Sequence, residues 1–382
     1  MTLTNAHISL FIPNLDGGGA ERITLNLAEG FAQRGLRVDL VLARAEGAYL
    51  NKVPSNVRLI NLRARSPVFL FKTLALKRYL HQEQPDFILS GLDIVSAATW
   101  AKRLAGSSTQ VIICVHTNLT QQFRDKPQFI LGQLRAFLVR QFYPWADKIL
   151  AVSQGVAESV AAIANLSVDE VGVIYNPVVT ADFYDKSRRP VEHPWFQANQ
   201  PPVILGVGRL VKQKDFATLI RAFAQVRRQR PVRLVILGDV DEREPTVKPQ
   251  LEALIQELNV ENDVLLPGFV DNPYAYMAKA SLFVLSSIYE GLPTVLIEAL
   301  AAGTSVVSTN CESGPVEILE NGKYGKLVPI EDANALAEAI NHALDHPLSS
   351  DLLQARADIF TMDKVIDQYL QVFEDLNHKR VA

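Results

Sequence analysis

The sequence predicts an α/β protein made of two doubly wound, Rossmann-like domains that face each other across a cleft. Three observations support this prediction: a length of 382 residues, a repeated alternation of short apolar runs with helical patterns, and one proline-rich interruption of that alternation. A chain of this length usually exceeds a single core. Continuously apolar strands are typical of a parallel sheet that helices cover on both faces through right-handed crossovers.

The first domain is expected to span residues 1–180. Its expected strands are short runs rich in apolar and β-branched residues, with helical patterns or loops between them. They cover residues 7–12, 37–43, 57–62, 86–91, 110–116, 148–153 and 171–177.

The alternation stops at an expected linker, residues 181–202, where prolines stand among charged and polar residues. It restarts in the second domain, residues 203–360. Residues 361–382 have the pattern of an amphipathic helix, which is expected to cross back to the first domain. The second set of strands covers residues 203–209, 233–239, 263–269, 282–287, 305–309 and 325–329.

The composition, with 48% hydrophobic and 21% charged residues, is that of an ordinary globular protein. Cys114 and Cys311 lie in or beside apolar runs, so we expect buried thiols in a reducing compartment, without a disulfide framework or metal cluster. The first residues do not resemble a signal peptide, and no segment approaches the roughly 18 apolar residues of a transmembrane helix. A cytoplasmic protein is therefore expected.

Ligands of such sheets bind beyond the carboxyl ends of the strands, and three glycines, Gly17–Gly19, follow the first expected strand. They allow close backbone approach, and a helix that begins near Ala20 directs its amide groups to the same place. The loop lacks the Gly-x-Gly-x-x-Gly spacing of a dinucleotide site. It is either a phosphate-approach loop or a tight turn.

Two cations, Arg209 and Lys214, follow the first expected strand of the second domain and precede a helix that begins near Asp215. Helix N-termini ordinarily prefer acidic residues, so cations at this place are informative. An arginine offers bidentate hydrogen bonds and a lysine a compact charge, which together suit a diphosphate.

Two carboxylates, Glu290 and Glu298, lie in the otherwise apolar segment SSIYEGLPTVLIEALAAG. Glu290 is expected to project into the cleft from a strand-end loop. Glu298 is expected about one turn inside the following helix, which Gly303 closes. A buried carboxylate requires a hydrogen-bonding partner, and a ligand with vicinal hydroxyl groups such as ribose would supply one.

One histidine, His116, directly follows a strand of the first domain, together with Thr117 and Asn118. A single histidine is more often structural than catalytic. Its position at a strand end, facing the presumed cleft, favours the functional interpretation.

Taken together, the segments GGGAER, VGRLVKQKD, GF, EGLPTVLIEALAAG and SGPVEIL resemble the family 4 retaining glycosyltransferases of the GT-B fold. The resemblance implies that the first domain binds an acceptor and the second a nucleotide-sugar donor. It assigns Arg209 and Lys214 to the donor diphosphate, Glu290 to the donor sugar and Glu298 to the ribose. It also places His116 against the sugar near the reacting centre.

Further donor contacts follow from the same resemblance. Segment 239–244, DVDERE, departs from the family pattern and is interpreted as a solvated acidic loop. The expected donor-binding residues are Gly18 and Gly19 in the first domain, Phe269 and Val270 at the nucleobase, and Gly291, Leu292, Pro293 and Thr294 beside the sugar and phosphates; Pro293 has no amide hydrogen to donate.

The resemblance implies front-face transfer with retained configuration, because no enzymic nucleophile is evident, and it implies neither cofactor nor metal. The expected donor is a UDP-sugar carrying a hexose or N-acetylhexosamine, with GDP-mannose as the leading alternative. The Ser-Gly-Pro version of segment 309–319 resembles bacterial enzymes of lipid-linked oligosaccharide and surface polysaccharide assembly. A glycan or polyprenyl-diphosphate-linked acceptor is therefore expected, and no nucleic acid.

Three alternatives remain at the level of sequence. A nucleotide-sugar epimerase would isomerise the donor without an acceptor, and a regulatory protein would bind nucleotide and transfer nothing. An inverting transferase would differ in the anomeric configuration of its product.

The segment 123–148 mixes cations with aromatic residues, a composition that suits an anionic lipid surface. The other interpretation is an amphipathic helix packed on the first domain. The first interpretation adds peripheral attachment to the inner face of the cell membrane. The residues concerned are Arg124, Lys126, Arg135 and Arg140, with Phe123, Phe129, Phe137, Phe142, Tyr143 and Trp145.

Overall fold

The computed structural model describes residues 3, 6–16, 18–64, 69–92, 96–124 and 129–381. Gly17 and Lys126 lie outside the described residues, as do the side chains of Arg124 and Phe129. The chain divides into two compact units. Unit 1 comprises Met1–Val178 and Thr361–Ala382, and unit 2 comprises Val179–Phe360.

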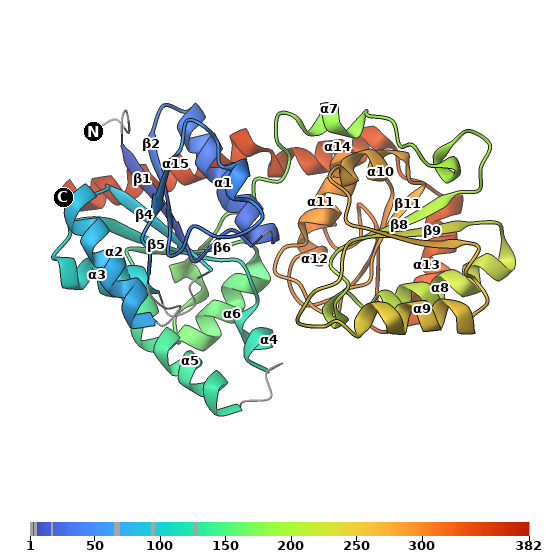
Figure 1. Ribbon diagram of the computed structural model, residues 1–382, viewed down its shortest axis with the longest axis horizontal. Coiled ribbons are helices and arrows are strands. Elements are labelled where there is room, and N and C mark those ends of the chain that lie inside the picture. The colour runs from blue at the N-terminus through green and yellow to red at the C-terminus, as the bar shows by residue number, and fades with distance from the viewer. Residues whose placement is uncertain are drawn as a thin grey trace. The chain divides into compact units, whose positions relative to one another are not determined.

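Unit 1 is built on a parallel sheet of seven strands in the order β3-β2-β1-β4-β5-β6-β7 (Figure 1). Every strand expected in this half is present. The central strands β1, β4 and β5 are buried throughout, as expected of a parallel sheet covered on both faces, whereas the edge strand β3 is largely exposed. The strands are β1 (His7–Ile12), β2 (Arg37–Leu42), β3 (Arg58–Asn61), β4 (Phe87–Gly91), β5 (Gln110–Val115), β6 (Lys148–Ala151) and β7 (Val171–Val173).

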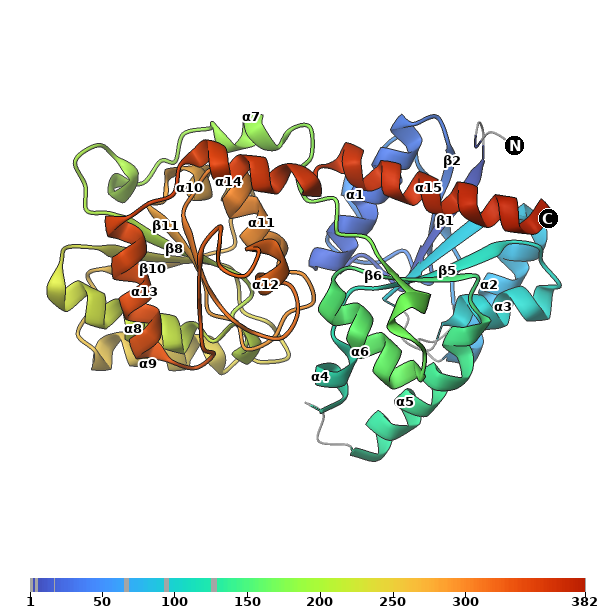
Figure 2. The same cartoon turned by 180° about the vertical axis from the view of Figure 1, so that it is seen from behind.

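Helices cover both faces of this sheet (Figures 1 and 2). On one face α1 packs with α15, where Phe373 lies 5.5 Å from Phe31 and stacks at 4.6 Å on Phe87 of β4. On the other face α2 and α3 share a core with Phe11 and Ile88. The helices are α1 (Gly19–Gln33), α2 (Phe69–Glu83), α3 (Ala97–Ala105), α4 (Leu119–Arg124), α5 (Phe129–Phe142), α6 (Gln154–Ala164) and α15 (Met362–Val381).

Unit 2 repeats the design with six parallel strands in the order β10-β9-β8-β11-β12-β13. The strands expected in this half are likewise all present. They are β8 (Val203–Val207), β9 (Arg233–Leu237), β10 (Val264–Gly268), β11 (Leu282–Leu285), β12 (Val306–Thr309) and β13 (Lys326–Val328).

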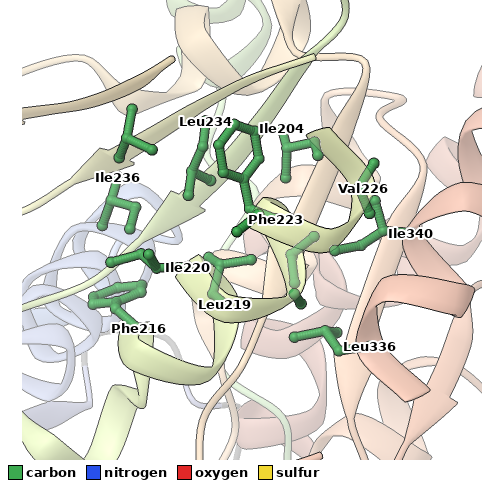
Figure 3. Packing of buried hydrophobic residues seen from close by; sticks show 14 of the residues in the cluster. Ile204, Phe216, Leu219, Ile220, Phe223, Val226, Leu234, Ile236, Leu336 and Ile340 are labelled. Atoms are coloured by element: carbon green, nitrogen blue, oxygen red, sulfur yellow. The ribbon is translucent and has the colours of Figure 1, made fainter. Parts of the chain in front are cut away.

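The core of unit 2 is formed where α8 and α13 pack on the sheet. Phe216, Phe223 and Val226 of α8 lie at helical spacing on one face, which places them against the strands and Ile340 of α13 (Figure 3). The helices of this unit are α7 (Phe183–Ser187), α8 (Phe216–Gln229), α9 (Val247–Glu257), α10 (Pro273–Lys279), α11 (Thr294–Ala301), α12 (Pro315–Ile318), α13 (Ala333–Asp345) and α14 (Ser350–Ala357).

The segment expected as a linker, residues 181–202, belongs to unit 2 in this division. It includes α7, whose buried Phe183 packs 4.7 Å from Tyr274 of α10. Residues 361–382, expected to cross back, belong to unit 1 as α15. No helix in the described part of the chain combines the length and apolar character that crossing a bilayer requires.

Candidate functional site

The loops at the carboxyl ends of the unit 2 strands are joined by backbone hydrogen bonds. The amide of Gly208 donates to Leu237 at 2.9 Å, and that of Gly238 donates to Gly268 at 2.9 Å. Gly238 has φ of +145°, and a Cβ there would lie 1.8 Å from the carbonyl oxygen of Gly208. Only glycine fits such a position, so this contact fixes the loop after β9 against the loop after β8.

Lys214 and Glu290, which the sequence places 76 positions apart, form an ion pair at this edge of the sheet. Lys214 Nζ lies 2.5 Å from Glu290 Oε1, and Ser287 Oγ donates to the same oxygen at 2.7 Å. The two charged side chains are 16% and 10% exposed. The Glu290 carboxylate is thus turned toward Lys214 at the strand-end edge of the sheet.

The loop carrying Lys214 is also fixed to the loop after β11 by its neighbours. Ser286 Oγ donates to the carbonyl of Lys214 at 2.7 Å, and Gln213 Nε2 donates to the carbonyl of Tyr289 at 2.8 Å. The amide of Ile288 donates back to Gln213 at 2.9 Å. The backbone at Lys214 is therefore held by hydrogen bonds between the loop after β8 and the loop after β11.

Arg209 reaches a carboxylate of segment 239–244, the segment expected as a solvated acidic loop. Its Nη1 lies 2.5 Å from Asp241 Oδ2, while 55% of the Arg209 side chain remains exposed. Asp241 is buried and also accepts hydrogen bonds from Arg243, which, with Arg209 nearby, lowers the pKa of Asp241 far below its usual range despite burial. Asp241 is therefore an anchor for Arg209, whereas Asp239 and Glu242 of the same segment are exposed, as expected of a solvated loop.

Glu298 lies slightly more than one turn inside α11, as predicted, and is 1% exposed. The helix ends before Gly303, which has φ of +77° and closes it as expected.

The turn before α11, Gly291–Pro293, is shaped by a neighbour from the Ser-Gly-Pro segment. Gly314 has φ of +87°, and a Cβ there would lie 2.5 Å from Pro293 Cδ. The strand-end loops also meet in an isolated bridge between Tyr289 and Glu312. Cys311 beside them is buried, and burial raises the pKa of its thiol to about 12, so it stays protonated at neutral pH.

At the end of β10 a large aromatic side chain is left on the surface. Phe269 is 62% exposed and Val270 is half-buried. A phenyl ring in water at the strand-end edge of a sheet is a suitable surface for a planar ring to stack on.

In unit 1 the glycine loop starts α1, with Gly18 at the N-cap and Gly19 as the first helical residue. Gly18 has φ of −80°, so no left-handed backbone conformation requires glycine at this position. A Cβ there would lie 2.5 Å from Glu21 Oε2, whereas a Cβ on Gly19 would meet nothing within 4 Å.

His116 follows β5 and is half-buried. Burial lowers its pKa to about 4 although the Asn176 side chain acts in the opposite direction, so the imidazole is neutral at pH 7. Gly91 of β4 lies beside the imidazole, and a Cβ there would meet His116 Nε2 at an ordinary contact distance of 3.6 Å. Asn118 has a local structural contact, because its Oδ1 accepts from the amide of Gln121 in α4.

The expected residues therefore fall into two groups. Arg209, Lys214, Glu290, Phe269 and the residues that start α11 gather at the strand ends of unit 2. His116, Gly18 and Gly19 lie at the strand ends of unit 1. Sequence patterns do not identify Ser287 as a partner of Glu290 or Asp241 as a partner of Arg209, although both residues lie close behind apolar strands. Within the described ranges, no three His, Cys, Asp or Glu side chains are placed to bind a metal ion.

Comparisons with known proteins match both units. A sequence model of the family described as Glycosyltransferase Family 4 matches residues 17–182, and one described as Glycosyl transferases group 1 matches residues 190–358. Sucrose-phosphate synthase of Thermosynechococcus elongatus superimposes with a TM-score of 0.78 at 22% identity, covering 98% of this chain and 100% of that structure.

Two curated relatives cover most of the chain. The N-acetylgalactosamine-N,N'-diacetylbacillosaminyl-diphospho-undecaprenol 4-alpha-N-acetylgalactosaminyltransferase of Campylobacter jejuni is 31% identical over 346 residues, which are 88% of this chain and 90% of the relative. The lipopolysaccharide core biosynthesis glycosyltransferase LpsE of Rhizobium meliloti is 28% identical, over 93% of this chain and 95% of the relative. The chain therefore belongs to glycosyltransferase family 4 and has the GT-B fold of two Rossmann-like domains.

Proposed function

We propose that this protein is a retaining glycosyltransferase that moves a sugar from a UDP-sugar to a polyprenyl-diphosphate-linked or other glycan acceptor. The observation that supports the proposal most directly is the fixed Lys214 ammonium at the strand ends of unit 2, 2.5 Å from Glu290. A departing nucleoside diphosphate gains negative charge, and a cation already held in place stabilises that charge without reorganisation.

Arg209 is the second cation of the proposed leaving-group site. Its guanidinium is anchored on Asp241 through one nitrogen and is half-exposed, so the remaining N–H groups are available to phosphate oxygens. We assign the diphosphate to Arg209 and Lys214 in preference to a metal ion.

The rest of the donor follows from the neighbouring elements. We assign the ribose to the buried carboxylate of Glu298 and the nucleobase to the surface of Phe269 and Val270. Glu290 would contact the donor sugar once the phosphates share Lys214. Backbone groups of Gly291, Leu292 and Thr294 would approach the sugar and phosphates, whereas Pro293 contributes shape alone.

Unit 1 would supply the acceptor side of the reaction. We assign Gly18 and Gly19, which leave the start of α1 open, to the diphosphate and acceptor, and neutral His116 to a hydroxyl group of the sugar. In the proposed front-face mechanism the acceptor hydroxyl oxygen bonds to the anomeric carbon. The leaving phosphate oxygen takes the proton of that hydroxyl group. The bond from the anomeric carbon to the phosphate breaks, and configuration is retained.

The acceptor class is proposed from the relatives. The Campylobacter jejuni relative is named for transfer of N-acetylgalactosamine to an undecaprenol-diphosphate-linked sugar, and the Rhizobium meliloti relative for lipopolysaccharide core synthesis. We therefore propose a UDP-linked N-acetylhexosamine or hexose as donor, and an enzyme that works peripherally at the inner face of the cell membrane. A thermal-shift panel of UDP, GDP, ADP and their sugars tests the base, because a ligand of the native state raises the melting temperature.

The assignment of the two cations is tested by Lys214→Ala and Arg209→Ala. Each is expected to lower kcat by about 10²–10³-fold, because each removes one preorganised charge from the leaving group. Lys212→Ala is the matched control, since Lys212 lies in the same turn with its side chain in solvent. Near-normal transfer by either site variant, or an inverted anomeric product by NMR, would contradict the proposal.

A further inference from the structure

The helix α2 exposes large apolar side chains on the face that points away from the sheet. Its inner face buries Leu76 and Leu80. Its outer face presents Leu70, Phe71 and Leu74, which are between 41% and 57% exposed. Residues three and four positions apart share a helix face, so Leu70 and Leu74 lie one above the other with Phe71 beside them. Adjacent exposed apolar side chains of this size are typical of a surface that meets another apolar environment.

The same helix layer exposes apolar residues on α3 and α5. Leu104 of α3 and Leu134 and Phe137 of α5 are about half exposed. Both views place α2, α3 and α5 on the side of the sheet opposite α1 and α15 (Figures 1 and 2).

An aromatic cluster joins these three helices. Trp100 of α3 lies 6.4 Å from Phe69 of α2 and 4.9 Å from Phe142 of α5, measured between ring centroids. Trp145, which follows α5, lies 5.1 Å from Trp100, and the Arg103 guanidinium lies 3.7 Å above its ring. These ring contacts join α2, α3 and α5 into one layer.

The charge of this layer is strongly one-sided. The helices α2, α3 and α5 carry seven Lys and Arg residues and a single acidic residue, Glu83. Glu83 is itself engaged by Arg58 at 2.6 Å. Lys102 of α3 is paired with Asp147 at 2.6 Å, and the layer still carries an excess of positive charge. An exposed apolar surface with such an excess is complementary to an anionic bilayer, which offers apolar chains beneath negative headgroups.

We propose that the outer faces of α2, α3 and α5 form a lipid face that docks on an anionic phospholipid bilayer, with Leu70, Phe71 and Leu74 entering the interface. The composition of residues 123–148 predicts a lipid surface in that segment, and the fold adds α2 to it. The inference rests on the proposed function in one respect, that the acceptor carries a lipid. Docking itself requires no catalysis.

The test is flotation of the whole chain with vesicles of phosphatidylcholine alone and of phosphatidylcholine mixed with phosphatidylglycerol. The chain is expected to float with the anionic vesicles, less so at high salt. Phe71→Ser/Leu74→Ser is expected to weaken binding by about tenfold or more, since two large apolar side chains are lost from the interface. Phe137→Ser on α5 is a second, independent variant.

Ile330→Ser/Leu352→Ser is the matched control, because both residues are exposed apolar positions of unit 2. Flotation of Phe71→Ser/Leu74→Ser at the wild-type level, or absence of wild-type flotation, overturns the proposal. A concentration-dependent dimer in sedimentation that only this variant loses would assign the face to a second copy instead. UDP is expected to raise the melting temperature of Phe71→Ser/Leu74→Ser and of the wild type equally. A loss of flotation with unchanged stabilisation by UDP is therefore a failure of docking and not of the donor site.

Discussion

Glu290 is held by two donors, the Lys214 ammonium and the Ser287 hydroxyl, and all three groups lie largely out of water. A carboxylate in such a place stabilises the fold only while its partners remain. The pair therefore has two consequences: it positions the cation proposed to meet the leaving group, and it makes the local structure sensitive to loss of either charge.

Glu290→Gln is accordingly expected to lower the free energy of unfolding by about 1–3 kcal/mol, because a partly buried lysine loses its counter-charge. Chemical denaturation of the purified variant measures this. Asp185→Asn is the control, since the pair of Asp185 with Arg188 is almost fully exposed and is expected to contribute less than about 1 kcal/mol. Equal losses in the two variants would show that burial of the Lys214 pair has no energetic effect.

At the scale of elements, α1 and α15 pack at a close approach through Gly30. A Cβ on Gly30 would lie 2.6 Å from Ile366 Cγ1 and 3.2 Å from Met362 Cγ. Arg34, one turn later, hydrogen-bonds to Asp363 at 3.0 Å and also to Asp367. A helix from the end of the chain is thus fixed to the first helix of unit 1.

Gly30→Ala is expected to destabilise the protein by about 1–3 kcal/mol through overpacking against buried Ile366. In an exposed helix the same change would raise the free energy of unfolding by about 1 kcal/mol. The sign of the measured change therefore shows whether the close contact with Ile366 is present. Ile366→Ala removes the clashing atoms, and in that background the cost of Gly30→Ala should disappear. A stabilising Gly30→Ala, or a cost that is independent of residue 366, would argue against the close contact.

At the scale of the whole molecule, half-buried His116 and buried Asp39 of unit 1 couple the stability of the fold to acid. The pKa of His116 falls from 6.5 to about 4 on folding because of burial. Burial opposes ionisation of Asp39, but bonds from Arg58 at 2.6 Å and from Tyr79 at 2.6 Å outweigh it and lower the pKa of Asp39 well below its ordinary 3.8. Both groups bind protons more weakly in the folded state.

A group with a lowered folded pKa contributes stability above its unfolded pKa, and this contribution is lost as the pH falls. We expect the His116 imidazole to lower the free energy of unfolding by up to about 1.4 kcal/mol for each unit by which the pH falls between 6.5 and about 4. Asp39 adds a further loss below pH 3.8. In His116→Gln, measured by denaturation at several pH values, the free energy of unfolding should change less between pH 6.5 and about 4. The loss below pH 3.8 should remain. An unchanged slope above pH 4 would exclude His116 as its cause.

The sequence by itself determined the two α/β halves, the strands, the strand-end location of the site residues and the position of Glu298 within its helix. These features are local, because an apolar run, a helix start and the residue after a strand are set by neighbours in the chain.

Only the tertiary structure decided which side chains meet. The pairing of Lys214 with Glu290, the anchoring of Arg209 on Asp241 and the fit of Gly314 against Pro293 each join segments that different strands bring to one edge of a sheet. The exposure of the apolar outer face of α2 was also decided by the tertiary structure. The periodicity of a sequence shows which residues are apolar, but only packing decides whether other residues cover them.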